Sequence, residues 1–311
     1  MVPMAGPSGQ PIRKPAVAGM FYPDDPGQCR AQAKAYTTLT ASGLAEAAGH
    51  NWIGGLVPHA GWICSAALAG QTIATLGSGG GKVDLVVVFG AIHTPIPTQL
   101  AVLDSFAKWD VPGDSCEIQN ELRARLLAGA APGSFMVDDR FHFREHAVEV
   151  ELPLIRSVWP DAAILPIEVP AVDSAVQIGR ATARLIAQMR QANAGAGRVV
   201  FLASSDLTHY GVNYGFMPAG IGLVGMQWAK HNDRPLIEKI LKLQAEAIVP
   251  EVRAHLNACG AGAIAAMLAA CKELGAGNAR LLRHATSFET LANVAPQSPD
   301  NAVGYASIVV G

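Results

Sequence analysis

The sequence predicts an α/β protein, a three-layer α/β/α sandwich around a mostly parallel central sheet. Short apolar runs typical of strands alternate with longer segments whose apolar residues have helical spacing, and this alternation favours a parallel sheet with helices on both faces. Two runs, Leu85–Phe89 and Val199–Ala203, are apolar on both sides of the pleat, as the central strands of such a sheet require. The sequence contains no internal repeat and no shift in composition that marks a second domain.

The strands are predicted where apolar runs lie between turn residues. In chain order they are Ile53–Val57, Val83–Gly90, Gln99–Asp104, Ala162–Val169, Val199–Ser205, Ala279–Ser287 and Ala302–Val310. Helices are predicted between them, in Ala-rich segments that place Leu, Ile and Met at helical spacing. They are Cys64–Leu76, Cys116–Leu127, Val148–Trp159, Ser174–Ala192, Pro235–Ala247 and Ala261–Leu274.

Composition excludes several classes of protein. The 311 residues are 50% hydrophobic and 15% charged, which supplies apolar material for a large core. With a formal net charge of −2, the chain has no general electrostatic attraction to nucleic acid or to an anionic membrane. Five cysteines without a C-x-x-C pair, and no evident secretory signal, predict a reduced protein of the cytoplasm. We expect residues 1–12 to form a loose lead and residues 13–311 to form one domain.

Three of the nine histidines each follow a run that is predicted as a buried strand. They are His59, His93 and His209, and Asp206 lies three residues before the last of them. In an open α/β sheet, ligands gather beyond the carboxyl ends of the strands. Because separate strands deliver these side chains to the same edge, we interpret them as a functional site and not as scattered core residues.

Two further features of the residues point to chemistry. Asp206 and His209 are close enough to interact if the turn between them is helical, and an aspartate can orient an imidazole for general acid/base work. Cys259 lies just before the last predicted helix, where the helix dipole favours the thiolate, the form that binds metal. The alternative is that Cys259 is a small buried residue packed against Gly260 and Gly262.

Three other patterns are weaker. Gly77–Lys82 is similar to a phosphate-binding loop, but its spacing is one residue short and it precedes a strand. His142–His146 matches H-x-x-E-H, the pattern of a zinc-dependent protease, and the alternative places Glu145 at a helix start, where a carboxylate suits the dipole. Ser204 and Ser205, close to Asp206 and His209, could suggest a Ser–His–Asp hydrolase, but the G-x-S-x-G elbow of such enzymes is absent from the sequence.

Motifs along nearly the whole chain resemble those of the Memo family, in the family's order. They are Arg13–Pro23, Val57–Gly61, Gly90–Thr94, Glu145–Glu149, Ser204–Gly211, Asn257–Gly260 and Val303–Ala306. The resemblance implies a fold similar to that of the class III extradiol dioxygenases, which hold Fe(II) with two histidines and a carboxylate. Bacterial members often accompany a radical-SAM protein and an AMMECR1-like protein, so these are the protein partners that the resemblance implies.

Memo proteins hold metal with two histidines and a cysteine. The resemblance therefore implies that His59, His93 and Cys259 are the metal ligands. It also implies that Asp206 and His209 line the same pocket, with the histidine where the dioxygenases keep an acid/base residue.

Four further side chains are expected near this site. Glu145 and His146 are expected beside the metal ligands, which weakens the interpretation as a protease. Trp62 and Tyr210 could wall the pocket, or could simply belong to the core.

The sequence therefore predicts a mononuclear non-haem metal site with extradiol-dioxygenase-like O₂ chemistry on a small phenolic or related substrate. Fe(II) is the expected metal, and Cu or Zn are alternatives because a cysteine ligand softens the site. His209 is expected to take a proton from the substrate hydroxyl, with Asp206 orienting it. A non-catalytic alternative is a metal-binding redox protein or a peptide-binding scaffold. Neither nucleic acid nor membrane is expected as a partner.

Overall fold

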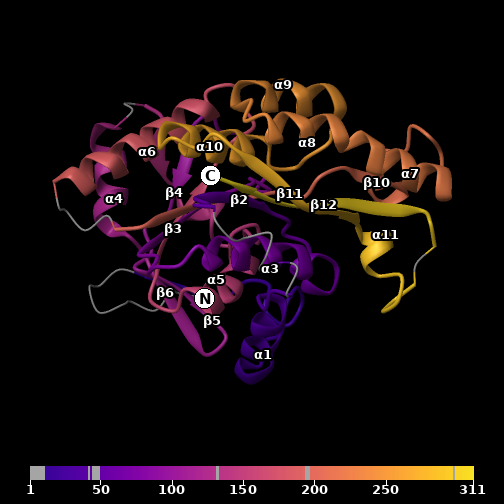
Figure 1. Ribbon diagram of the computed structural model, residues 1–311, viewed down its shortest axis with the longest axis horizontal. Coiled ribbons are helices and arrows are strands. Elements are labelled where there is room, and N and C mark those ends of the chain that lie inside the picture. The colour runs from indigo at the N-terminus through magenta and orange to yellow at the C-terminus, as the bar shows by residue number, and fades with distance from the viewer. Residues whose placement is uncertain (1–10, 41–42, 44–49, 131–132, 193–196, 297) are drawn as a thin grey trace.

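The computed structural model describes residues 11–40, 43, 50–130, 133–192, 197–296 and 298–311. It has three layers, with a large sheet between two groups of helices (Figure 1). One group consists of α6 (Ala175–Gln191), α8 (Arg234–Leu241), α9 (Ala245–His255) and α10 (Ala261–Glu273). The other group consists of α1 (Pro26–Tyr36), α3 (Trp62–Ser78) and α5 (Leu152–Val158). The predicted three-layer α/β/α sandwich is confirmed.

The large sheet is mixed and has nine strands in the order β10-β12-β2-β9-β3-β8-β4-β7, with β11 paired to β12. The strands are β2 (Gly54–Val57), β3 (Leu85–Gly90), β4 (Ala101–Leu103), β7 (Phe135–Val137), β8 (Ala163–Glu168), β9 (Val199–Ser204), β10 (His209–Gly211), β11 (Ala279–Thr286) and β12 (Asn301–Val310). Strands β2, β9, β3 and β8 are parallel neighbours, whereas β12 is antiparallel to β2, β10 and β11, and β4 is antiparallel to β8. The four central strands are therefore parallel to one another, whereas antiparallel pairings occur on both sides of them.

Seven of these strands lie where the sequence predicts them. Six of the seven are runs of mostly buried residues, whereas β11 is largely half-buried or exposed. A second, three-stranded sheet was not predicted; it consists of β1 (Ile12–Arg13), β5 (Lys108–Val111) and β6 (Asp114–Glu117). Its strands are short and mix polar with apolar residues, so they carry a weak pattern. The lead predicted at residues 1–12 lies outside the described residues except for its last two, and Ile12 belongs to β1.

Three predicted helices have different boundaries in the structure. Cys116 belongs to β6, so the segment Cys116–Leu127 forms a helix only at α4 (Asn120–Arg125). Val148–Trp159 begins with a 3₁₀ turn before α5. Pro235–Ala247 is divided between α8 and α9 at Leu243, whose φ is 53°. A left-handed residue in the middle of an apolar periodic segment leaves no mark in the periodicity, so the pattern could not reveal this break.

Further short elements complete the chain. They are α7 (Leu223–Asn232), α11 (Ser287–Thr290), the 3₁₀ turns η2 (Asp139–Phe141), η3 (Glu149–Glu151) and η4 (Val212–Tyr214), and the π turn η1 (Leu126–Ala130). Among the described residues, no helix combines the length and the apolar character that crossing a bilayer requires.

Helix α10 is buried along most of its length, between the sheet and α6. A helix that is apolar all round belongs in such a place, and small residues let its neighbour come close. At Gly179 of α6, a Cβ atom would lie 2.0 Å from the carbonyl oxygen of Ala266. The two helix backbones therefore touch at this point, and this contact holds α10, with Cys259 just before it, against the sheet.

The centre of the sheet brings the ends of four strands together. Val57 at the end of β2 is in register with Ser204 at the end of β9, and Gly90 at the end of β3 is in register with Glu168 at the end of β8. The chain segments that follow these strands therefore start from one edge of the sheet, which is where an open α/β sheet places its ligands.

Gly179→Ala tests the helix contact. Alanine is favoured over glycine in a helix by about 1 kcal/mol, but here overpacking against the Ala266 carbonyl should dominate and lower the free energy of unfolding by about 1–3 kcal/mol. Urea denaturation measures the change. Gly277→Ala is the matched control, because a Cβ atom there would meet no atom within 4 Å. Equal stability of Gly179→Ala and the wild type would contradict the packing described.

Candidate metal centre

Three histidines converge beyond the strand ends. His59 follows β2, His93 follows β3, and His146 comes from the loop that precedes η3. Each offers one ligand atom, and these atoms all lie within 4.8 Å of one another. The ring centroids are 5.1 Å apart for His59 and His93, 5.3 Å for His59 and His146, and 4.5 Å for His93 and His146. This spacing suits three imidazoles around a single ion.

The hydrogen bonds of Ser204 determine the tautomer of His59. The serine hydroxyl donates its only proton to the carbonyl of Ala147, at 2.5 Å. It must therefore accept from Nδ1–H of His59, which lies 2.9 Å away. Nε2 of His59 then carries the lone pair, as a metal ligand requires. Burial lowers the pKa of this histidine to about 3, so the ring is neutral at physiological pH.

Glu145 supports the other two histidines. Its carboxylate accepts hydrogen bonds from Nδ1 of His93 at 2.8 Å, from the backbone N–H of His93 at 2.9 Å, and from the backbone N–H groups of His146 and Ala147 at 2.8 and 3.0 Å. Although burial raises the pKa of Glu145, the contacts with His93 and the backbone outweigh it and lower the pKa to about 2. This arrangement, a carboxylate behind a histidine, is the usual outer support of a metal ligand.

The protonation of the two supported histidines follows from the same contacts. Burial lowers the pKa of His93, but its hydrogen bond to Glu145 more than compensates and leaves the pKa raised. Burial lowers the pKa of His146, whose Nδ1 lies 3.4 Å from the Glu145 carboxylate. In both rings Nδ1 faces Glu145, which leaves Nε2 as the nitrogen available to a ligand.

Cys259 lies beside the three histidines and not among them. Its sulfur is 3.2 Å from Nε2 of His59, yet it is not part of the group whose ligand atoms lie within 4.8 Å of one another. Burial, with a further contribution from the charge of Asp206, raises the pKa of the thiol. The pKa of this thiol is therefore raised, contrary to the lowering expected from its place at a helix start. The structure also places His146, expected as a neighbour of the ligands, within the group itself.

Asp206 joins the histidine cluster to His209. One carboxylate oxygen accepts from the backbone N–H of His59 at 2.8 Å, and the other lies 3.7 Å from Nε2 of His209. Burial raises the pKa of Asp206, but the two histidines outweigh it and leave the pKa lowered. Nε2 of His209 is buried and has no hydrogen-bond partner among the described residues, and the ring packs on Tyr214 at 4.9 Å.

The two aromatic residues expected near the pocket are buried within the fold. Trp62 donates from Nε1 to the carbonyl of Val150 at 3.0 Å. Tyr210 donates from its hydroxyl to the carbonyl of Gly220 at 2.6 Å. Both residues are at most 3% exposed, and buried aromatic residues commonly pair their polar atoms in this way. Core packing accounts for both residues.

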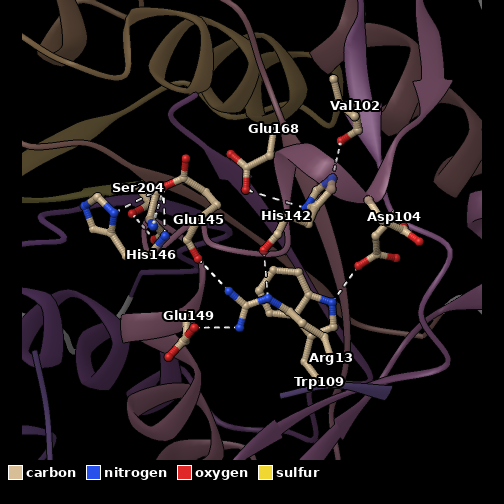
Figure 2. Close-up of polar contacts among 12 residues, drawn as sticks. Arg13, Val102, Asp104, Trp109, His142, Glu145, His146, Glu149, Glu168 and Ser204 are labelled. Atoms are coloured by element: carbon tan, nitrogen blue, oxygen red, sulfur yellow. Dashed lines mark hydrogen bonds and ion pairs between the residues drawn. The ribbon is translucent and has the colours of Figure 1, made fainter. Parts of the chain in front are cut away.

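A buried arginine holds the loop that carries Glu145 and His146. Arg13 of β1 donates to the carboxylate of Glu149 at 2.6 Å, to the carbonyl of Glu145 at 2.6 Å and to the carbonyl of His142 at 2.9 Å. Figure 2 shows the guanidinium between these groups, with the ring of Trp109 against it. The sequence interpretation missed this residue, although Arg13 opens the first motif of the family resemblance.

The sequence matches the family of Memo-like proteins over residues 13–309. The chain belongs to the Memo family. It is 34% identical to a MEMO1 family protein of Methanosarcina barkeri over 303 residues, covering 96% of this chain and 100% of the relative. It is also 34% identical to a MEMO1 family protein of Pyrobaculum arsenaticum, covering 96% and 98%. The predicted family is therefore confirmed, and with it the extradiol-dioxygenase-like fold.

In this Memo protein the H-x-x-E-H segment is not a protease motif. His142 is fully buried, and its Nε2–H donates to the carbonyl of Val102 at 3.1 Å. Nδ1 of the same ring faces Glu168 at 3.7 Å (Figure 2), and His142 is not part of the group of three histidines. Only His146 of the two motif histidines belongs to the cluster, and the motif glutamate supports ligands.

Behind Glu145 lies a buried acid without a partner. Both carboxyl oxygens of Glu168 are buried and make no hydrogen bond within the described part of the chain. Burial and the nearby charge of Glu145 raise the pKa of Glu168 well above its usual range. Burial lowers the pKa of His142 to about 4, so this ring is neutral at pH 7. The raised pKa of Glu168 favours its protonated form, whose proton can point toward Nδ1 of His142.

Glu168→Gln tests this protonation. The unfolded chain loses the Glu168 proton near its ordinary pKa of 4.5, whereas the folded chain keeps it to a higher pH. The contribution of Glu168 to stability is thus full below that pH and falls as the pH rises toward the folded pKa, by up to about 1.4 kcal/mol per pH unit. Glutamine has no such proton to lose.

The free energy of unfolding of Glu168→Gln, relative to that of the wild type, should therefore increase as the pH is raised from about 5 to 8. Urea denaturation at several pH values measures this difference, and Glu117→Gln, at an exposed acid on β6, gives the baseline. A difference that stays constant with pH would mean that Glu168 is ionised in the folded protein.

Proposed function

We propose that the protein binds a single Fe(II) ion through His59, His93 and His146 and catalyses extradiol-dioxygenase-like O₂ chemistry on a small phenolic substrate. The observation that carries the proposal is the convergence of three imidazoles whose ligand atoms lie within 4.8 Å of one another. Membership of the Memo family supports a metal-binding protein. The iron, the substrate class and the activity are the steps that we propose beyond it.

The residues of the cluster fit a divalent transition metal. Imidazole suits Fe, Cu and Zn, so the donor set admits Cu or Zn as alternatives to iron. Three protein ligands leave coordination positions for other molecules, as in catalytic metal sites. The ionised carboxylates of Glu145 and Asp206 add negative charge close to the rings. When bound, Fe(II) would supply the redox chemistry that O₂ activation needs and would favour the ionised form of a phenol.

The chain's own residues account for the proton transfers. His209 is the proposed acid/base, because its Nε2 is buried, has no hydrogen-bond partner among the described residues and faces Asp206. We propose that Nε2 accepts the proton of the substrate hydroxyl and later returns it. Asp206 would stabilise the protonated ring and hold it toward the cluster, since its other oxygen is bound to the backbone of His59. The present separation of 3.7 Å would shorten on protonation.

The metal ligands can be tested directly. We expect His146→Ala, purified without oxygen, to bind Fe(II) at least about tenfold more weakly than the wild type, because it loses an imidazole ligand. Cys259→Ala should keep its iron, because the sulfur lies outside the group. Metal analysis and Fe(II) titration measure both variants, and His231→Ala, at an exposed histidine of α7, is the control. Loss of iron in Cys259→Ala with retention in His146→Ala would instead favour a two-histidine, one-cysteine site.

The acid/base role needs a separate measurement. We expect iron-loaded wild type to consume O₂ with a catechol, and His209→Ala to keep its iron while O₂ uptake falls by about 10²-fold or more. An oxygen electrode with a panel of phenols measures the rate. Unchanged uptake in His209→Ala would remove the histidine from the mechanism. Absence of uptake in stoichiometrically loaded wild type with every phenol would favour the non-catalytic alternative, a metal-binding redox or scaffold protein.

A further inference from the structure

A cavity opens beside the histidine cluster, on the side of His93. Its volume is about 430 Å³, and its lining consists of His93, Thr94, Pro95, Arg140, Phe143 and Arg144. The first three follow β3. Arg140 belongs to η2, and Phe143 and Arg144 lie in the loop between η2 and His146. The cavity therefore shares one wall with the candidate metal centre, and its size is that of a site for a small molecule.

Two arginines line this cavity, and only one of them is paired with a carboxylate. Arg140 is paired with Asp138, whose carboxylate accepts from Nε at 2.9 Å and from a terminal nitrogen at 2.5 Å. Arg144 is exposed, and within the described part of the chain it makes no hydrogen bond or ion pair. A guanidinium without a partner, at the mouth of a cavity, presents its fork of donors to whatever enters.

The carboxylate that is next in the chain does not neutralise the charge of Arg144. Glu145 follows it directly in the chain, but the Glu145 side chain is buried and accepts hydrogen bonds from His93 and from the backbone of His146 and Ala147. The chain thus turns Glu145 inward and leaves Arg144 outside. Within H-x-x-E-H, His142 and Glu145 are buried, and the two intervening residues line the cavity.

The first of the two intervening residues, Phe143, supplies an apolar surface. Phe143 is 48% exposed, which is high for a large apolar side chain, and it lines the cavity together with Pro95. Exposed aromatic side chains in a concave site commonly contact the apolar part of a ligand, while a few polar groups orient it. An aromatic ring and a free guanidinium, on adjacent residues, suit a flat apolar molecule with an anionic group.

We propose that this cavity binds a small aromatic molecule through an anionic substituent, a carboxylate or a phosphate, which Arg144 holds while the ring packs on Phe143. This inference rests on the proposed function in one respect, that the molecule is the substrate of the adjacent metal centre. His93 belongs to both the cavity and the cluster, so a molecule seated on Arg144 has its ring beside the candidate metal ligands.

The test uses binding to the protein without added metal, so that it is independent of any activity. The probes are benzoate and benzamide, which have nearly the same shape and differ in charge, and phenyl phosphate, which distinguishes a preference for phosphate from one for carboxylate. We expect the wild type to bind benzoate or phenyl phosphate about tenfold or more tightly than benzamide, as a charge-assisted contact with arginine implies. Ligand-observed NMR titration measures the dissociation constants.

Arg144→Ala should remove this preference for the anion and leave the binding of benzamide unchanged. Arg144→Lys should recover part of it, since it keeps the charge but not the planar fork. Arg140→Ala is the control within the same cavity, and a smaller effect is expected because Asp138 already neutralises this residue. Equal thermal midpoints show that the variants are folded.

Wild type that binds benzamide as tightly as the anions, or that binds none of the probes, would overturn the inference. So would an Arg144→Ala variant that keeps its preference for the anion. Failure of the proposed function gives a different result, namely normal anion binding through Arg144 in a protein that consumes no O₂ when loaded with iron.

Discussion

The candidate metal centre depends on one buried ion pair, between Arg13 and Glu149. Both side chains are at most 1% exposed, and removing one partner of such a pair leaves the other as an uncompensated buried charge. Here both partners also make further hydrogen bonds. Arg13 also binds the carbonyls of His142 and Glu145, while Glu149 accepts from the backbone of residues 16 and 17 and from the hydroxyl of Tyr22. The pair thus joins the first described strand to the loop that carries a proposed metal ligand.

This connection matters because the loop of residues 142–149 has little regular structure of its own. A histidine on a strand end is positioned by the ladder of the sheet, as His59 and His93 are. His146 has no such ladder, and its place depends on side-chain hydrogen bonds to the loop backbone. The carbonyl of Glu145 is held by Arg13, and its carboxylate is held by His93. Glu145 therefore orients both the loop that carries His146 and the segment after β3 that carries His93.

The sequence predicted those parts of the site that follow from strand periodicity. His59, His93 and Asp206 each come soon after an apolar run, and the structure places all three at one edge of the sheet. His146 follows no strand, so its membership of the cluster could not be read from periodicity. The motif around it indicated metal chemistry but implied a helix, whereas the segment is a loop in which His142 is buried outside the histidine group.

The same limit applies to the fold. Seven strands were predicted within a few residues, and six of them are the mostly buried runs that an apolar pattern marks most clearly. The short strands β1, β5 and β6 were not, since long-range pairing and not local pattern determines them. Arg13 shows the consequence for the site, because its role depends on contacts with residues more than 100 positions away in the chain. No local pattern in the sequence could have revealed these contacts.

The charges around the cluster follow from which carboxyl groups have partners. Glu145 and Asp206 are buried yet keep lowered pKa values, because histidine side chains and backbone N–H groups face them. Glu168 and Glu151 are buried without any such partner in the described part of the chain, and burial raises their pKa values. The contacts therefore favour the ionised form of Glu145 and Asp206 and the protonated form of Glu168 and Glu151. Two negative charges beside three imidazoles match the charge of a divalent cation, which supports the proposed occupant independently of the spacing of the histidines.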